Sequence, residues 1–184
     1  MVKVSVIIPV YNVENYLRQC LDSVVNQTLR EIEIICVNDS STDGSLAILE
    51  EYARKDARIQ VITQPNAGAG AARNRGMDAA GGQYLSFLDA DDFFEPVMLE
   101  HAYEAAEQNR ADFVVYKSDQ YHTEEDKYVP VSWAVREQEL PPYPVFNYRQ
   151  MTDNVFKVFV GWAWDKLFSR EFVLRHQLRY QEQR

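Results

Sequence analysis

The sequence predicts an α/β fold with a doubly wound, mostly parallel sheet. Up to residue 116, short apolar runs rich in β-branched residues alternate with longer segments whose apolar residues recur at helical spacing. Each helical segment is long enough to be a crossover connection, which parallel strands require. Polar residues follow three of the strand-like runs directly, at the end of a strand where ligands of such sheets bind.

Strands are expected wherever β-branched and apolar residues form a short run between turn residues. The first run is closed by Pro9, which cannot donate a ladder hydrogen bond. The third run is shorter than the others and is expected nearer an edge of the sheet. The expected strands are Val2–Val10, Glu31–Val37, Ile59–Thr63, Tyr84–Leu88 and Asp112–Tyr116.

Helices are expected between these strands. Asn12 is a suitable cap for the first helix, Thr42 or Asp43 for the second, and Pro96 suits the first position of the fourth. The third helix, Ala67–Ala80, is rich in Ala, Gly and Arg. The expected buried faces are Leu17, Cys20, Leu21, Val24 and Val25 in the first helix, Leu46, Leu49, Tyr52 and Ala53 in the second, and Leu99, Ala102, Tyr103 and Ala106 in the fourth.

The pattern changes after residue 116. Residues 117–148 contain four prolines with Tyr, Trp and Glu, which indicates irregular structure or a short hairpin. Helical spacing returns over Met151–Val160, and an aromatic cluster follows over Gly161–Phe168. Ser169 is a suitable cap for a last helix that runs to about Gln177.

Composition excludes several classes of protein. The 184 residues carry a formal net charge of −9, so the chain lacks the basic surface of a nucleic-acid-binding protein and the polybasic patch that holds a protein to anionic lipid. Cys20 and Cys36 have no CxxC spacing and fall in apolar patterns, which predicts two buried free thiols. No apolar run approaches the roughly 20 residues that span a bilayer. We expect a soluble, cytoplasmic protein.

Three strand ends carry the residues that could bind a ligand or take part in catalysis. They are Pro9-Val10-Tyr11-Asn12, Val37-Asn38-Asp39-Ser40 and Asp89-Ala90-Asp91-Asp92. The crowded carboxylates of the third end repel one another unless a cation lies between them. Capping of the fourth helix explains one of these carboxylates, whereas Mg²⁺ or Mn²⁺ explains the set. On the residues alone the two interpretations are equally supported.

Asp39 and Arg73 each have two interpretations. Asp39 suits an Asx turn as well as it suits accepting a hydrogen bond from a base or ribose. Arg73 follows Gly68-Ala69-Gly70, which matches a dinucleotide-binding fingerprint at two glycines only and follows the wrong strand. A helix N-terminus built from small residues is the better interpretation of that segment. Arg73 and Arg75 point in different directions on this helix, so one can face a nucleotide while the other is solvated.

Together these segments resemble the family 2 glycosyltransferases. The resemblance is carried in order by Val6–Asn12, Val37–Asp43, Asn66–Gly76 and Phe87–Asp92, and it covers residues 2–116. The later Trp164-Asp165-Lys166-Leu167-Phe168 resembles a segment of members that build bacterial cell-surface polysaccharides.

The resemblance implies a GT-A fold, a nucleotide-diphosphate sugar donor, most often a UDP-sugar, a divalent Mn²⁺ or Mg²⁺, and inversion at the anomeric carbon. It assigns Pro9 and Tyr11 to the base pocket, and Asp39 and Arg73 to contacts with the base. It assigns Asp89 and Asp91 to the DxD pair, in which Asp89 also faces the donor and Asp91 is the nearer metal ligand. Residues 1–116 would then form the nucleotide-sugar-binding core, and residues 117–184 would begin an acceptor-side region of the same domain.

One part of the family pattern has no match. An inverting transferase needs a carboxylate base, and in resembling proteins an acidic pair follows the Trp-x-Lys-Leu segment by a few dozen residues. Asp153 and Asp165 are carboxylates near this segment, but neither occupies the family position. We therefore expect the base beyond Arg184 and regard the chain as the donor-binding part of a longer protein.

The sequence favours a transferase that acts on a saccharide or lipid-linked acceptor in cell-surface polysaccharide synthesis. A sugar nucleotidyltransferase is the second interpretation, although the first strand is not followed by its glycine-rich basic loop. A non-catalytic nucleotide-sugar-binding module is the third. Peripheral membrane association of the full protein, the oligomeric state and the sugar are left open.

Overall fold

The computed structural model describes residues 1–131, 135–136, 140–151 and 161–182. The chain forms two compact units. The first contains Met1–Val114 and the chain from Lys166 onward, and the second contains Val115–Asp165. The expected region of residues 117–184 is divided between the two units, because Lys166 and the residues after it belong to the first; its acceptor-side role stays a prediction.

The first unit is built on a six-stranded sheet in the order β3-β2-β1-β4-β8-β5. Strands β1 to β4 are mutually parallel where they pair, and β8 runs antiparallel to β4. The predicted doubly wound, mostly parallel α/β fold is therefore confirmed. The strands are β1 (Val4–Val10), β2 (Ile32–Asn38), β3 (Ile59–Thr63), β4 (Tyr84–Phe87), β5 (Phe113–Val115) and β8 (Lys166–Ser169).

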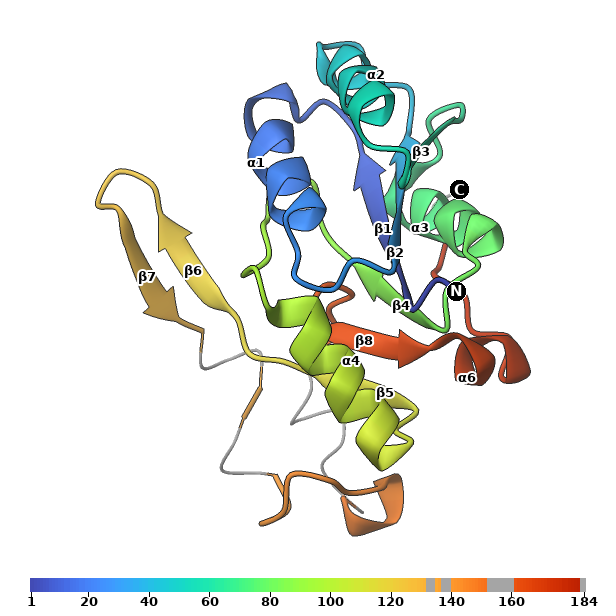
Figure 1. Ribbon diagram of the computed structural model, residues 1–184, viewed down its shortest axis with the longest axis vertical. Helices are drawn as coiled ribbons and strands as arrows, with labels where there is room; N and C mark the ends of the chain where they lie inside the picture. The colour runs from blue at the N-terminus through green and yellow to red at the C-terminus, as the bar shows by residue number, and fades with distance from the viewer. Residues whose placement is uncertain (132–134, 137–139, 152–160, 183–184) are drawn as a thin grey trace. The chain divides into compact units, whose positions relative to one another are not determined.

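Helices cover both faces of this sheet. Helices α1 and α4 lie on one side, and α3 and α6 lie on the other (Figure 1). Across the described residues, no helix is both long enough and apolar enough to cross a membrane. The helices are α1 (Glu14–Val25), α2 (Ser45–Lys55), α3 (Gly68–Ala79), α4 (Met98–Asn109) and α6 (Arg170–Arg175).

The core lies where these layers meet the central strands. Every residue of β2 except Glu33 is buried, and β1 is buried except at Pro9. Both strands are therefore mostly apolar, interrupted by Ser5 in β1 and by Glu33 and Asn38 in β2, as expected for parallel strands covered on two faces. Helix α3 approaches β1 closely because Gly76 has no side chain, and a Cβ there would collide with Ile7.

The helix starts differ from the sequence predictions. Helix α1 has Val13 at its N-cap without a side-chain bond, because the Asn12 side chain is used elsewhere. Helix α2 has Gly44 at its N-cap and neither Thr42 nor Asp43, although Asp43 accepts a hydrogen bond from the N–H of Ser45, the first residue of the helix. Helix α4 begins at Met98 rather than Pro96. In α2 the buried positions include Ile48, which the predicted face omitted.

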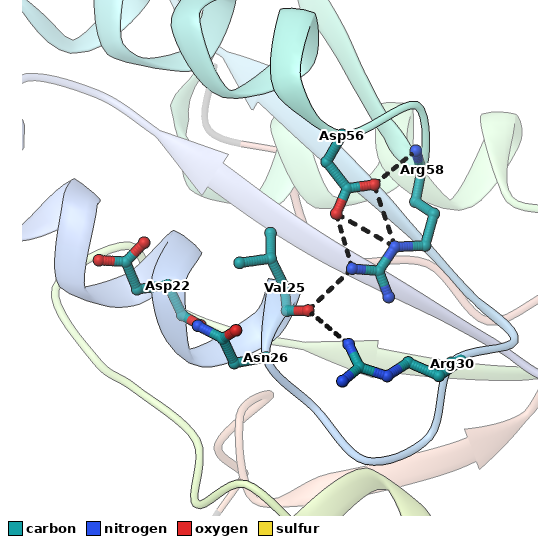
Figure 2. Close-up of polar contacts among 6 residues, drawn as sticks. All are labelled: Asp22, Val25, Asn26, Arg30, Asp56 and Arg58. Atoms are coloured by element: carbon teal, nitrogen blue, oxygen red, sulfur yellow. Dashed lines mark hydrogen bonds and ion pairs between the residues drawn. The ribbon is translucent and has the colours of Figure 1, made fainter.

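The end of α1 is fixed by two arginines. The carbonyl oxygen of Val25 accepts hydrogen bonds from Arg30 Nη1 at 3.2 Å and from Arg58 Nη2 at 2.8 Å (Figure 2). Asp56 holds the Arg58 guanidinium through a bond to Nη2 at 2.6 Å. Cations at a helix C-terminus satisfy its free carbonyls and complement its dipole, so this contact stabilises α1 and links it to the start of β3.

Strand β8 was not expected. The sequence there was interpreted as the end of an aromatic cluster, but Leu167 pairs with Ser86 and Phe168 pairs with Leu85 in an antiparallel ladder. Ser169 ends the strand and caps α6 through a bond from the N–H of Phe172, as predicted. The helix stops at Arg175, two residues before the predicted end.

The second unit contains the predicted hairpin. Strands β6 (Asp119–His122) and β7 (Lys127–Pro130) pair antiparallel, and the rings of Tyr121 and Tyr128 lie 5.1 Å apart on it. A short 3-10 helix, η2 (Tyr148–Gln150), follows with Asn147 as its cap. The rings of Trp162 and Trp164 stack at 6.0 Å. Of the helix predicted over 151–160, residues 152–160 lie outside the described part of the chain.

Candidate donor-binding site

The carboxyl ends of β1, β2 and β4 meet at one edge of the sheet. Pro9 is in register with Val37, and Ile7 is in register with Phe87. The strand order reverses direction between β1 and β4, and ligands of open α/β sheets bind outside such a switch point. The three strand ends singled out in the sequence therefore lie together, as predicted.

Two of the loops at this edge are tied to each other. Asn12 Oδ1 accepts from the N–H of Thr42 at 2.7 Å, and Asp43 Oδ2 accepts from the N–H of Glu14 at 3.1 Å. Glu14 Oε2 in turn accepts from the N–H of Gly44 at 2.5 Å. The loop after β1 thus supplies partners for the start of α2, and the loop after β2 for the start of α1. This exchange presents a preformed surface to a ligand.

The end of β1 offers an aromatic ring. Pro9 is half-buried, while the side chain of Tyr11 is 50% exposed beside it. An exposed ring next to a rigid proline can stack on a planar ligand, because aromatic faces attract one another in offset geometry. This arrangement is compatible with the base-pocket role expected for both residues.

Asp39 anchors a loop. It is 3% exposed, and its carboxylate accepts from Gln64 Nε2 at 2.8 Å, from the N–H of Ala67 at 2.9 Å and from the N–H of Gly68 at 2.8 Å. These contacts give hydrogen-bond acceptors to the backbone N–H groups at the start of α3, and they fix the loop after β3 to the end of β2. A carboxylate has about four acceptor positions, so one remains for a base or ribose donor. The contact with a base remains a prediction.

Arg73 and Asp89 form the central ion pair of the site. Arg73 Nη2 lies 2.5 Å from Asp89 Oδ1, and the two side chains are 17% and 29% exposed. Arg73 projects from the second turn of α3, and Asp89 follows β4, so the pair bridges the third and fourth strand–helix units. Among the described residues, no acceptor meets the buried Nε of Arg73.

The other two carboxylates of the cluster are exposed. Asp91 and Asp92 do not cap α4, whose N-cap is Val97, so capping is excluded as the reason for the cluster. The pKa of Asp92 is raised from 3.8 to about 6, first because surrounding protein displaces water from its carboxyl group and then because Asp91 and Asp89 carry like charges. Added positive charge near these groups would relieve the repulsion.

A cation here would need further ligands. Within the described ranges, no group of three or more His, Cys, Asp or Glu residues converges on a common point. Two carboxylates completed by water and substrate phosphates are nevertheless the usual Mg²⁺ arrangement, and oxygen donors suit Mn²⁺ as well. The donor set at Asp89 and Asp91 therefore fits either ion.

The two cysteines take no part in this chemistry. Both are free and buried, as predicted. Burial raises the pKa of the Cys20 thiol well above 9.0, and burial raises the pKa of the Cys36 thiol to about 12. A thiol that stays protonated is a poor nucleophile, so both act as small apolar core residues.

Two residues beside the site, Asn74 and Tyr180, had no role predicted from the sequence. Asn74 is only 6% exposed although it is polar, and its side chain binds the backbone of Tyr180. The Tyr180 ring lies against Arg73, with 5.4 Å between the ring centroid and Cζ. The two partners are 106 residues apart, so no local pattern could connect them.

The structure assigns the role of general base to neither candidate carboxylate. Asp165 belongs to the second unit and is fully buried, which prevents it from meeting an acceptor hydroxyl at the surface. Asp153 lies outside the described residues. His101 lies on α4 and His176 at the end of α6, and neither follows one of the three strands; His122 lies on β6 in the second unit.

The sequence profile of the family described as Glycosyl transferase family 2 matches residues 5–174. This chain belongs to that family. The match includes every strand end described above and also β8, so the family resemblance extends beyond the residue 116 at which the strongest motifs end.

Among curated relatives, this family 2 chain is 39% identical over 183 residues to the uncharacterized glycosyltransferase EpsJ of Bacillus subtilis (strain 168). That alignment covers 97% of this chain and 51% of EpsJ. Glycosyltransferase GlyA of Streptococcus pneumoniae is 50% identical over 113 residues, or 61% of this chain and 16% of GlyA. Almost all of this chain therefore aligns with EpsJ, but it spans only about half of the length of EpsJ.

Solved structures place the family 2 chain in the GT-A fold. S. aureus TarS 1–349 in complex with UDP-GlcNAc superimposes with a TM-score of 0.79 at 25% identity, over 98% of this chain and 49% of TarS. The mannosyltransferase PcManGT of Pyrobaculum calidifontis, in complex with GDP-Man and Mn²⁺, superimposes with a TM-score of 0.69 at 19% identity, over 95% of this chain and 46% of PcManGT. The second likeness concerns the fold alone.

Proposed function

We propose that this chain binds a nucleotide-diphosphate sugar at the ends of β1, β2 and β4 and is the donor-binding part of an inverting glycosyltransferase. The single observation that carries the proposal is the Arg73–Asp89 ion pair beside Asp91 at the switch between β1 and β4. An acidic chain has no general affinity for a diphosphate, so it needs a local device of this kind. Family membership supports transfer of a sugar as the reaction class.

The nucleotide is proposed to lie over the end of β1. Pro9 and the exposed ring of Tyr11 would form its base pocket, and Asp39 would hold the Gln64–Gly68 loop beside it. UDP is the first choice of nucleotide because TarS, which superimposes over 98% of this chain, was crystallised with UDP-GlcNAc. The acceptor is proposed to be a saccharide or a lipid-linked saccharide of cell-surface polysaccharide synthesis.

Asp89 and Asp91 would hold the Mn²⁺ or Mg²⁺. Asp89 already shares Oδ1 with Arg73, whereas Asp91 is exposed, so we assign Asp91 as the nearer ligand. The bound ion would offset the negative charge that develops on the departing diphosphate. Arg73 would orient Asp89 and add a fixed positive charge on the same side. Inversion also needs a carboxylate that takes the acceptor proton, and we assign that base to no described residue.

A thermal-shift experiment tests this proposal. UDP, GDP and ADP are each added to the chain with Mn²⁺, with Mg²⁺ or with chelator. UDP at 100 times its Kd should add about 2.7 kcal/mol of apparent stability in Mn²⁺ and much less in chelator. Asp91→Asn should remove most of that difference. Equal stabilisation by UDP in chelator would contradict the metal assignment, and no stabilisation by any nucleotide would contradict the donor site.

A module that binds the donor without transferring sugar is the second candidate. Burial of Asp165 favours it for this chain, because an enclosed carboxylate cannot activate an acceptor. UDP release from UDP-sugar, with and without a saccharide acceptor, separates the two functions. A positioned base contributes typically 10²–10⁴-fold in rate, so acceptor-dependent release at ordinary enzymatic rates would exclude the binding module.

A further inference from the structure

We propose that Asn74 and Tyr180 are positioning residues that hold Arg73 against Asp89. We call residues 179–182 the clamp. They lie across α3 and place the Tyr180 ring against Arg73. The inference rests on the proposed function to the extent that Arg73 is assigned to the donor site. The geometry of the clamp is independent of that assignment.

The side chain of Asn74 binds the backbone of Tyr180. Its Nδ2 donates to the carbonyl oxygen of Tyr180 at 3.0 Å, and its Oδ1 accepts from the N–H of the same residue at 2.9 Å. Nδ2 also donates to Glu182 Oε1 at 3.0 Å. An amide that meets both backbone groups of one residue imitates a strand neighbour, which explains why an asparagine is buried on α3. Removing it would leave the partly buried backbone groups of Tyr180 unpaired.

The clamp has two further points of contact with α3. Arg179 forms an ion pair with Asp78, and its Nη1 donates to the carbonyl oxygen of Asn74. Gly70 leaves room for the segment, because a Cβ at this position would collide with the carbonyl oxygen of Gln181. The segment therefore touches α3 from the first turn of the helix to the third.

The Tyr180 ring connects the clamp to the Arg73–Asp89 ion pair. Its centroid lies 5.4 Å from Arg73 Cζ and 5.1 Å from the Phe87 ring, which it meets edge to face at 77°. Phe87 is the last residue of β4 and precedes Asp89 by two positions. The ring thus contacts the arginine on one side and the strand that carries its carboxylate partner on the other.

Arg73 needs this support because little else orients it. An arginine side chain loses considerable rotamer freedom when it is fixed, and a planar guanidinium directs its donors only when its plane is set. The bond from Nη2 to Asp89 is a single contact, and Nε meets no acceptor within the described residues. The aromatic face of Tyr180 sets the plane in which the remaining donors point.

The chain contains a matched control for the ring. Tyr103 on α4 also meets another aromatic ring, that of Tyr84 at 5.7 Å and 88°, and it also lies under a cation, Lys3 Nζ, at 5.1 Å. Tyr84 is the first residue of β4, so this arrangement lies at the opposite end of the strand from Asp89. Tyr103→Leu therefore removes the same kinds of contact without touching Arg73.

The test measures the affinity of UDP with Mn²⁺ by calorimetry and the side-chain Nε–H signal of Arg73 by NMR, the latter without ligand. We expect Tyr180→Leu to weaken UDP binding about tenfold, in the range of the loss of a desolvated cation–π contact. Tyr180→Phe and Tyr103→Leu should bind within about threefold of the native chain. Gly70→Ala, which favours the helix but obstructs residues 179–182, should behave like Tyr180→Leu.

The two readouts separate the inference from the proposed function. If the native chain binds no nucleotide, the donor site fails, and the clamp is judged by NMR, where Tyr180→Leu and Gly70→Ala should shift or broaden the Arg73 signal and Tyr103→Leu should not. If UDP binds and Tyr180→Leu changes neither affinity nor signal, the clamp is refuted. It is also refuted if Tyr180→Leu weakens binding equally in an Arg73→Lys background, because the effect would then bypass the arginine.

Discussion

Asp39 Oδ2 accepts a hydrogen bond from the backbone N–H of Gly68 at 2.8 Å, so the carboxylate that follows β2 satisfies the first residue of α3. The other carboxylate oxygen serves Gln64 and Ala67. This one side chain therefore connects three consecutive parts of the strand-end surface: the end of β2, the loop after β3 and the start of α3. If Asp39 also contacts the nucleotide base, it does so in addition to these hydrogen bonds and not in place of them.

Asp39→Ala should lower the free energy of unfolding in the absence of ligand. The substitution leaves the N–H groups of Ala67 and Gly68 without their acceptor, which costs about 1–3 kcal/mol. Urea unfolding measures the change, with Asp91→Ala as a control that should stay within about 0.5 kcal/mol of the native chain because Asp91 is exposed. If Asp39→Ala keeps native stability and loses only UDP affinity, the carboxylate serves the base and not the loop.

Gly76→Ala should destabilise the contact between α3 and β1. The added Cβ meets the side chain of Ile7, which is fully buried and cannot move away. Overpacking of this kind costs about 1–3 kcal/mol even though alanine favours helix. Ile7→Ala in the same chain should relieve the collision, so the double variant should be more stable than the two single effects added together predict. Gly161→Ala is the control, because within the described part of the chain its added Cβ meets no atom within 4 Å apart from its own chain neighbours. Strict additivity of Gly76→Ala and Ile7→Ala would contradict the packing described.

Asp92→Asn should stabilise the ligand-free chain in a pH-dependent manner. The folded-state pKa of Asp92 is raised to about 6 by reduced hydration of its carboxyl group and by Asp91 and Asp89, so the folded state disfavours the charge. The penalty is absent below about pH 4, grows as pH rises through 6 and is constant above it. Solvent screening of this exposed group keeps the gain below about 1 kcal/mol. The melting temperature of Asp92→Asn should exceed that of the native chain by more at pH 7.5 than at pH 4.5. A gain that is equal at both pH values would show that ionisation of Asp92 is not its cause.

Much of the fold could be predicted from local pattern. The third strand matches its predicted bounds of Ile59–Thr63, because β-branched residues there lie between a helix end and a proline turn. Strand β8 could not be predicted, because Leu167 and Phe168 owe their strand conformation to pairing with β4, far away in the sequence. Asn12 was wrongly predicted to cap α1, since its side chain has an equally good partner in the loop after β2.

The same division applies to the site. The convergence of Asp39 and Asp89 followed from parallel strands alone, because their carboxyl ends share one edge. Their partners did not follow, since Gly68 and Arg73 reach them through loop and helix geometry that no spacing encodes. Tyr180 is the extreme case, because only the folded chain brings it over α3.

The most direct test of the central claim is an anomalous diffraction map of the chain crystallised with UDP and Mn²⁺. We predict one manganese peak beside Asp91 and Asp89, in contact with diphosphate oxygens, with the uracil over Tyr11 and Arg73 still paired with Asp89. A manganese peak remote from these carboxylates, or UDP bound away from the ends of β1 and β4, would contradict it.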